Sequence, residues 1–162
     1  MKKLNLVLLC PEIPQNTGNI SRTCAVTGAS LHLIRPFGFE ISDRTLKRAG
    51  LDYWDKLDVH YYDGYDEFLA AHPGAPIYYF SAHAARSFAK ADYPDGVFLV
   101  FGRESCGLPE EILRENFDRT LRIPMLPDRR CLNRSNAVAV AAYEVLRQWG
   151  YEGFAEEGSL GK

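Results

Sequence analysis

The sequence has 162 residues, 46% of them hydrophobic and 25% charged, and its formal net charge is −2 at pH 7. This composition is typical of a single soluble globular domain, and it excludes a disordered chain, a collagen-like chain and a coiled coil. No apolar run is long enough to span a membrane, and the nearly balanced charge argues against a polybasic nucleic-acid coat while leaving room for a local basic site.

The first ten residues, Met1–Cys10, resemble a lipoprotein signal only superficially. The apolar stretch is short, is interrupted by Asn5 and runs into Pro11 without a small-residue cleavage site, so we interpret it as a buried strand. The cysteines are too widely spaced for a Cys-x-x-Cys pair, and the histidines are scattered. We therefore predict reduced thiols in a cytoplasmic protein and no metal site. The cysteines are Cys10, Cys24, Cys106 and Cys131.

Short apolar runs alternate with helical patterns along the whole chain, which predicts an α/β fold. Leu6–Cys10 and Val97–Phe101 are continuously apolar, as expected for strands that are covered on both faces of a parallel sheet. We expect one domain over residues 1–150, with a parallel sheet flanked by helices, and a short flexible tail over residues 151–162. The expected strands are Leu4–Cys10, Leu31–Arg35, Leu57–Tyr61, Ile77–Ser81, Val97–Phe101 and Thr120–Ile123. The expected helices are Thr17–Thr27, Ser42–Arg48, Tyr65–His72, Ala84–Ala89, Pro109–Asn116 and Ser135–Trp149.

The last expected helix, Ser135–Trp149, is apolar on more than one side. Val138 and Val145 mark one apolar face at helical spacing, whereas Val140 lies on the opposite side. One face can pack on the sheet of its own chain, and the other packs most simply on a second copy. We therefore predict a homodimer that is joined partly through this helix, with Tyr143 at or near the interface. The alternative is that the alanines of this helix serve helix propensity alone.

The first motif is Pro14–Arg22, directly after the first strand. Asn16 or Thr17 can cap the helix that follows. Asn19 and Arg22 are three residues apart and so project from the same helix face, at the carboxyl edge of the sheet, where α/β proteins bind ligands. The alternative interpretation is an ordinary capped helix that carries a surface arginine.

The second motif, Leu99–Pro109, joins a buried strand to a helix through a loop with Gly102 and Gly107. Such a loop allows backbone N–H groups to approach a ligand closely. It lacks the Gly-Lys-Ser/Thr of a Walker loop and the Gly-x-Gly-x-x-Gly of a dinucleotide fold. A plain strand-to-helix turn is the alternative.

The third motif, Ile123–Ala137, places amide and hydroxyl side chains just before the last helix, where Asn133 or Ser135 can cap it. Between residues 119 and 134 there are five arginines and one acid, Asp128. This local positive charge suits phosphate. A charged, solvated loop is the alternative.

In their order and spacing, the three motifs resemble the SPOUT class of RNA methyltransferases, and within it the TrmH-like ribose 2′-O-methyltransferases. The similarity is greatest to the tRNA (cytidine/uridine-34-2′-O)-methyltransferases of the TrmL type, and it covers about residues 4–150. It includes Pro11–Pro14 before the first motif and the stretch Leu46–Trp54. The resemblance implies a parallel sheet whose C-terminal segment forms a deep trefoil knot, which general connection rules disfavour.

The resemblance also implies S-adenosylmethionine as the methyl donor, held in the loops of the second and third motifs. The residues that correspond to the family's cofactor contacts are Phe80, Gly102, Ile123, Cys131 and Leu132. Three positions depart from the usual pattern: Cys131 stands where serine is usual, Leu132 where methionine is more frequent, and Arg134 where an apolar residue is more usual. A backbone contact tolerates the first two changes, whereas Arg134 enlarges the basic patch.

The implied reaction is attack of a ribose 2′-oxygen on the methyl group of S-adenosylmethionine. The family assigns activation of the hydroxyl to the residue at Arg22, but a guanidinium is effectively always protonated and is a poor general base. Arg22 can instead hold the adjacent phosphate and stabilise the developing alkoxide. Asn16, Glu104 and Asn133 are then expected to be positioning residues in the catalytic site.

The expected partner is a tRNA anticodon loop, bound by basic side chains outside the cofactor pocket. The candidates are Arg44, Lys47, Arg48, Arg129 and Arg130, with Lys3 as a weaker one. The expected substrate is the wobble nucleotide, position 34, of tRNA-Leu species, as cytidine or 5-carboxymethylaminomethyl-uridine. Three alternatives stay open: methylation of another tRNA or rRNA nucleotide, a non-catalytic RNA-binding protein with the same fold, and a nucleotide-binding metabolic enzyme.

Overall fold

The chain alternates strands and helices, as the sequence predicts. The structure is a computed structural model, and it describes residues 1–40 and 54–161. The strands are β1 (Asn5–Leu9), β2 (Ser30–Ile34), β3 (Val59–Tyr62), β4 (Ile77–Phe80), β5 (Arg86–Ser87), β6 (Phe98–Phe101) and β7 (Thr120–Arg122). The α-helices are α1 (Pro14–Thr27), α3 (Tyr65–Ala71), α4 (Glu110–Glu115) and α5 (Arg134–Gln148), and the short 3-10 helices are η1 (Trp54–Lys56), η2 (Phe88–Lys90) and η3 (Phe117–Arg119).

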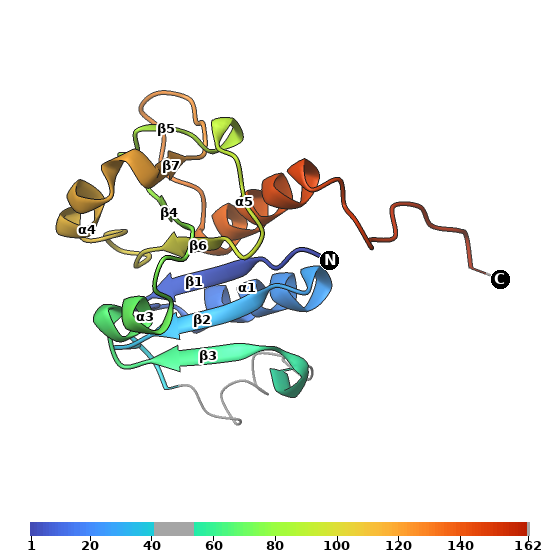
Figure 1. Ribbon diagram of the computed structural model, residues 1–162, viewed down its shortest axis with the longest axis horizontal. Helices are drawn as coiled ribbons and strands as arrows, with labels where there is room; N and C mark the ends of the chain where they lie inside the picture. The colour runs from blue at the N-terminus through green and yellow to red at the C-terminus, as the bar shows by residue number, and fades with distance from the viewer. Residues whose placement is uncertain (41–53, 162) are drawn as a thin grey trace.

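The strands form a seven-stranded sheet in the order β3-β2-β1-β6-β4-β7-β5, and every pairing within it is parallel. The central strand β1 pairs with both β2 and β6, so that Leu6 lies opposite Leu31 on one side and opposite Leu99 on the other. Figure 1 shows helices on both sides of this sheet and the C-terminal tail running away from the body. The predicted single α/β domain with a parallel sheet is confirmed.

The side chains of β1 alternate between two hydrophobic cores, because successive residues of a strand point to opposite faces. Leu6 and Leu8 join the core that α1 and α5 cover, whereas Val7 and Leu9 join the core beneath α3 and α4. All five residues of the strand are buried. A central strand covered on both faces explains why Leu6–Leu9 is continuously apolar.

Helix α1 begins earlier than the sequence predicts. Its first residue is Pro14, where a fixed φ and a missing N–H are tolerated, and its N-cap is Ile13, which makes no side-chain capping hydrogen bond. The expectation that Asn16 or Thr17 caps the helix is therefore wrong, since both lie buried inside its first turns. The helix ends as predicted at Gly28, whose φ of 72° is the left-handed conformation that favours glycine.

The helix predicted over Ala84–Ala89 does not form. This segment holds the two-residue strand β5 and the start of η2 instead. Arg86 pairs with Leu121 in the sheet, and the backbone N–H of Ala85 donates a 2.9 Å hydrogen bond to Thr120 Oγ1. These tertiary hydrogen bonds outweigh the weak helix propensity of the alanines in so short a segment.

Helix α5 has the two-sided character that its sequence predicts. Val138, Ala141 and Val145 are fully buried against the sheet and α1, whereas Val140 and Tyr143 are 42% and 44% exposed. The helix ends in a Schellman-type turn at Gly150, as expected. An apolar stripe on α5 is thus left outside the core of its own chain.

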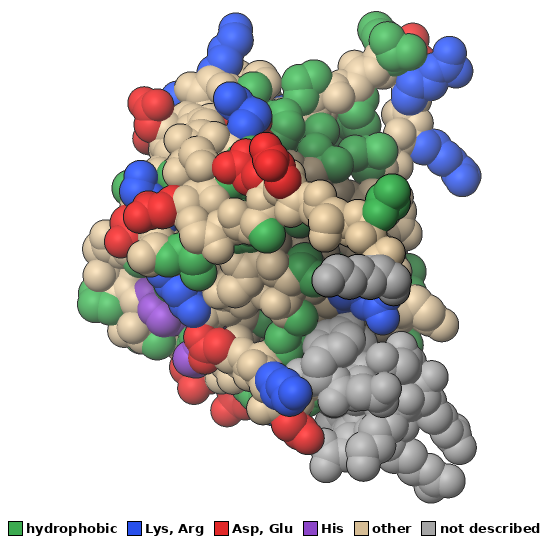
Figure 2. Space-filling view, turned by 90° about the vertical axis from the view of Figure 1, so that its right-hand side faces the viewer, with side chains coloured by type: hydrophobic (Ala, Val, Ile, Leu, Met, Phe, Trp, Pro, Cys, Tyr) green, Lys and Arg blue, Asp and Glu red, His purple; other side chains and the backbone are tan. Residues whose placement is uncertain are grey.

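The helix predicted over Ser42–Arg48 and the stretch Leu46–Trp54 lie largely outside the described residues. Within the part of the chain that is described, no helix is both long and apolar enough to cross a bilayer. Acidic and basic side chains are interspersed on the face shown in Figure 2, as the nearly balanced net charge predicts.

Candidate functional site

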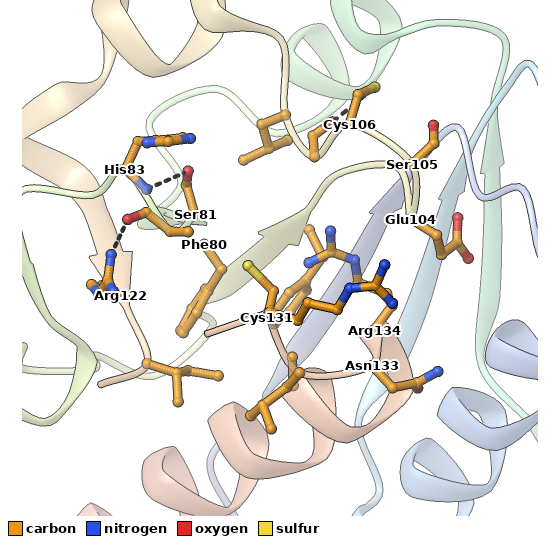
Figure 3. Close-up of a pocket in the computed structure, with 18 of the residues that line it drawn as sticks. Phe80, Ser81, His83, Glu104, Ser105, Cys106, Arg122, Cys131, Asn133 and Arg134 are labelled. Carbon is orange, nitrogen blue, oxygen red and sulfur yellow. Dashed lines mark hydrogen bonds between the residues drawn. The ribbon is translucent and has the colours of Figure 1, made fainter. Parts of the chain in front are cut away.

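A cavity of about 710 Å³ lies beside the carboxyl ends of β4, β6 and β7. Its walls come from the segments that follow these strands and from the first turn of α1 (Figure 3). The carboxyl edge of a parallel sheet is where α/β proteins bind ligands, because the loops there converge on one crevice. Residues of all three sequence motifs line this one cavity.

One wall of the cavity is apolar. The rings of Phe80 and Phe101 stack with their centroids 4.8 Å apart at the ends of two neighbouring strands. Ile123 and Leu132, from the segment after β7, line the same space. This wall can take an aromatic or apolar part of a ligand.

The loop after β6 folds back on itself. Arg103 and Gly107 exchange two backbone hydrogen bonds of 3.1 and 2.8 Å. A Cβ atom at Gly102 would lie 2.1–2.2 Å from the backbone of Gly107 and Leu108, so only glycine fits there. The close contact that requires glycine at position 102 is therefore with the returning loop. The sequence instead predicts close approach of a ligand.

Glu104, in this loop, holds the start of α1. Its carboxylate accepts hydrogen bonds from the backbone N–H groups of Glu12 at 2.9 Å and Ile13 at 3.3 Å, and from Asn16 Nδ2 at 3.4 Å. Ser105 Oγ donates a 2.7 Å bond to the Glu12 carboxylate in the reverse direction. Two distant motifs are thereby joined at one side of the cavity, and a negative charge stands at the amino end of a helix.

Asn133 caps α5 on another side of the cavity. Its Oδ1 atom accepts hydrogen bonds from the backbone N–H of Ser135 at 2.9 Å and from Ser135 Oγ at 2.6 Å. The sequence predicts a cap at Asn133 or Ser135, and the structure assigns it to Asn133. The cap sets where, within the third motif, the helix begins.

Arg134 is a cavity residue to which the sequence assigned only a share in a basic patch. Its Nη2 atom donates a 3.0 Å hydrogen bond to the carbonyl oxygen of Arg103, and its Nε atom is buried with no partner among the described residues. Burial lowers the pKa of the guanidinium, and the nearby Glu104 opposes that shift. The observation that marks Arg134 as a candidate binding residue is its buried, unpaired donor, which only the structure shows.

The pattern of the SpoU rRNA Methylase family matches residues 3–143 of the chain. The chain belongs to this family. A protein of Geobacillus stearothermophilus is 49% identical to this chain over 155 residues, with 94% of this chain and 99% of the relative covered. A tRNA (cytidine(34)-2′-O)-methyltransferase of Saccharophagus degradans is 47% identical over 150 residues, which are 92% of this chain and 97% of that protein. The resemblance read from the three motifs is confirmed.

Solved structures agree with the fold of the SpoU methylase. A structure described under the words "2-OH methylation of C/U34 on tRNA" is 51% identical, covers 93% of this chain and 98% of its own, and superposes with a TM-score of 0.86. The SpoU methyltransferase AviRb of Streptomyces viridochromogenes, in complex with AdoMet, superposes with a TM-score of 0.79. It is 24% identical and covers 91% of this chain and 58% of its own, so it supports the fold alone.

The cavity of the SpoU methylase brings together most of the residues that the sequence placed in its catalytic and cofactor sites. Two expected residues are not among those that line it: Gly102, which is buried behind the loop, and Arg22, which lies on the exposed side of α1. The expected residues that line it are Asn16, Phe80, Glu104, Ile123, Cys131, Leu132 and Asn133.

The expected RNA-binding residues do not all lie at the cavity. Arg130 lines the cavity, and Arg129 is exposed beside it in the same segment. Lys3 lies before the amino end of β1, at the opposite edge of the sheet, where it pairs with Asp58 at 3.4 Å. The other three expected residues, Arg44, Lys47 and Arg48, lie outside the described residues.

The four cysteines differ in their exposure to solvent. Cys10 and Cys24 are buried, whereas Cys106 and Cys131 are exposed and line the cavity. All four are free thiols. Among residues 1–40 and 54–161, the structure contains no group of three or more His, Cys, Asp or Glu side chains that is able to hold a metal ion.

Proposed function

We propose that this protein uses S-adenosylmethionine to methylate the ribose 2′-oxygen of the wobble nucleotide, position 34, in a small set of tRNA-Leu species. The nucleotide is cytidine or 5-carboxymethylaminomethyl-uridine. The observation that carries the proposal is the single cavity on which all three motifs converge. The relatives named as tRNA (cytidine(34)-2′-O)-methyltransferases support the choice of nucleotide.

The residues of the cavity fit S-adenosylmethionine. Phe80, Ile123 and Leu132 offer an apolar wall for the adenosine part, and Glu104 offers negative charge toward a sulfonium. The buried, unpaired Nε atom of Arg134 needs an acceptor. When bound, the cofactor supplies an electrophilic methyl group. Cys131 and Leu132, which replace the more usual serine and methionine, keep the contacts that their backbone can make.

Arg22 would act on the RNA side of the reaction. It is exposed on α1, two turns beyond the residues that Glu104 holds. Because a guanidinium does not lose its proton near neutral pH, Arg22 binds the phosphate next to the target ribose and stabilises the alkoxide that forms at the 2′-oxygen. The proton then leaves to water or to the phosphate.

Asn16, Glu104 and Asn133 would act as positioning residues. Glu104 fixes the start of α1 through the backbone of residues 12 and 13, and Asn16 adds a side-chain hydrogen bond to the same carboxylate. Asn133 fixes the third motif where it enters α5 by capping that helix. Small displacements of these loops slow a transfer reaction strongly, since the reacting atoms must lie about 3 Å apart and in line.

The RNA would be held by basic side chains, of which Arg129 is exposed beside the cavity and Arg130 lines it. Arg129 and Arg130 lie in the segment between β7 and α5, and Arg44, Lys47 and Arg48 complete the proposed set. Phosphate contacts of this kind position the RNA without reading its sequence. An anticodon loop suits such a surface, because its unstacked nucleotides can enter a pocket that a duplex cannot.

The proposed enzyme is a cytoplasmic homodimer. The exposed stripe of α5 that holds Val140 and Tyr143 supports a contact between two copies, since a large apolar side chain on the surface gains by being covered. A second copy also adds RNA-binding surface beside the cavity. The C-terminal trefoil knot that the family implies belongs to the same proposal.

Methyl transfer to defined RNAs tests the proposed reaction. Purified protein, S-adenosylmethionine with a labelled methyl group and tRNA-Leu transcripts are combined, and a matched transcript carries a 2′-deoxy nucleotide at position 34 alone. We expect incorporation into the first transcript and none into the second, and we expect the rate to fall steeply with added salt. Equal incorporation into both transcripts would move the reaction to another nucleotide. Tight RNA binding without any transfer would favour a non-catalytic RNA-binding protein.

A further inference from the structure

Arg134 is the first residue of α5, and its side chain projects into the wall of the cavity. In Figure 3 its guanidinium lies between Cys131 and Glu104. The side chain is partly buried, and its Nη2 atom donates a 3.0 Å hydrogen bond to the Arg103 carbonyl oxygen. The Nε–H is shielded from solvent and has no partner within the described part of the chain.

Leaving a buried donor unpaired is unfavourable, and for a charged group the penalty is larger than for a neutral one. In the described part of the chain, no nearby protein group supplies the missing acceptor. Glu104 is close enough to influence Arg134, but its carboxylate oxygens already accept from the backbone of residues 12 and 13 and from Asn16. A ligand that brings an anionic acceptor into the cavity allows the guanidinium to turn and pair Nε and Nη2 together, which is the geometry that arginine offers to carboxylates.

We propose that Arg134 binds the carboxylate at the amino-acid end of S-adenosylmethionine. This inference rests on the proposed function, which places that cofactor in the cavity, and it adds a residue where the family more usually has an apolar side chain. The positive charge of the Arg134 guanidinium matches the negative charge of the carboxylate at this end of the cofactor.

An RNA phosphate is the competing anion, and the position of Arg134 disfavours it. Phosphates of a bound RNA stay at the protein surface, where Arg129 and Arg130 are exposed. Arg134 is instead partly buried in the wall of the cavity, and its Nε atom is shielded from solvent. A small ligand inside the cavity reaches this side chain more directly than a polymer outside it.

Calorimetry with two ligands tests the assignment. The probes are S-adenosylhomocysteine and its decarboxylated analogue, which differ only in the carboxylate, and the proteins are the full-length wild type, Arg134→Leu and the control Arg114→Leu. Arg114 is an exposed residue of α4 that pairs with Glu110, away from the cavity. We expect decarboxylation to weaken binding to the wild type and the control about tenfold or more, and to change binding to Arg134→Leu less than twofold.

The pattern of affinities separates this inference from the proposed function. If the wild type binds neither probe, the cofactor assignment fails and this inference fails with it. If the wild type binds S-adenosylhomocysteine and decarboxylation weakens Arg134→Leu as much as the wild type, only this inference is overturned. The same holds if Arg134→Leu keeps its affinity for S-adenosylhomocysteine but loses affinity for tRNA, because Arg134 would then serve a phosphate. Binding of the decarboxylated analogue by Arg134→Leu at wild-type strength shows that the variant is folded.

Discussion

Oε2 of Glu104 accepts a 2.9 Å hydrogen bond from the backbone N–H of Glu12, although 92 residues separate the two positions. The bond joins the loop after β6 to the start of α1, and α1 carries Arg22. A carboxylate that accepts from backbone N–H groups at the amino end of a helix is favoured both by hydrogen bonding and by the helix dipole. The placement of Arg22 relative to the cavity therefore depends on Glu104.

Glu104→Gln should weaken this connection. The amide keeps one acceptor oxygen, but its NH₂ group cannot accept from a backbone N–H, and the charge is lost. We expect the free energy of unfolding to fall by about 1–2 kcal/mol and the rate of methyl transfer to fall more than the affinity for S-adenosylhomocysteine. Chemical denaturation, steady-state kinetics and calorimetry measure the three quantities. Glu110→Gln is the control, because its exposed pair with Arg114 contributes well under 1 kcal/mol. Equal stability of the two variants would contradict this role.

Arg22→Ala should abolish methyl transfer while leaving cofactor binding nearly intact. Arg22 lies on the exposed side of α1 and does not line the cavity, so its removal leaves the walls unchanged. We expect a loss of about a hundredfold or more in kcat, as for other groups that stabilise developing negative charge, with the affinity for S-adenosylhomocysteine within about twofold of the wild type. A parallel loss of cofactor affinity and activity would make Arg22 a structural residue instead.

Val140→Glu should dissociate the proposed homodimer. Val140 is 42% exposed within one chain, so glutamate is tolerated in the monomer, but burial of an unpaired charge between two copies costs about 3 kcal/mol or more. We expect a dimer for the wild type and a monomer for the variant in sedimentation at micromolar concentration. Ala137→Glu is a poorer probe, because Ala137 is only 8% exposed and packs inside its own chain. Phe117→Glu, at an exposed apolar residue of η3, is the control and should stay dimeric.

The buried imidazole of His32 should make the fold sensitive to acid. Its ring nitrogens lie 2.8 Å from Tyr62 Oη and 3.1 Å from Asn5 Oδ1. Burial, with a smaller contribution from the nearby imidazoles of His60 and His72, lowers the pKa of His32 to about 3. The folded state thus keeps His32 neutral while the unfolded chain takes up a proton below pH 6.5. The contribution of neutral His32 to the free energy of unfolding is fully present above pH 6.5 and is lost as the pH falls toward 3.

Denaturant unfolding at pH 7, 6 and 5 measures this effect. We expect the free energy of unfolding to fall below pH 6.5 with a slope that approaches about 1.4 kcal/mol per pH unit from His32, with other groups adding to it. His32→Gln should flatten the curve, although it lowers stability at pH 7. His83→Gln, which changes an exposed histidine, should leave the slope as it is. A wild-type slope equal to that of His32→Gln would show that His32 is already protonated in the fold.

Local sequence patterns determined six of the seven strands, most of the helices and the family. Continuous apolar runs mark β1 and β6 because both faces of these strands are covered, and Gly28 marks the end of α1 because glycine tolerates a positive φ. The three motifs predicted one site because parallel strands deliver their following loops to the same edge of a sheet. These features depend on residues that are near neighbours in the chain.

Only the tertiary structure decided what each motif residue contacts. Ala84–Ala89 has a helical composition, yet pairing of β5 with β7 and the hydrogen bond from Ala85 to Thr120 hold it extended. The bond between Glu104 and Glu12 joins positions that no local pattern relates. The burial of the unpaired Nε of Arg134 appears only in the folded chain. Burial and long-range pairing are properties of the folded chain. Exclusion of water strengthens the hydrogen bonds that form and raises the free-energy cost of a donor that stays unpaired.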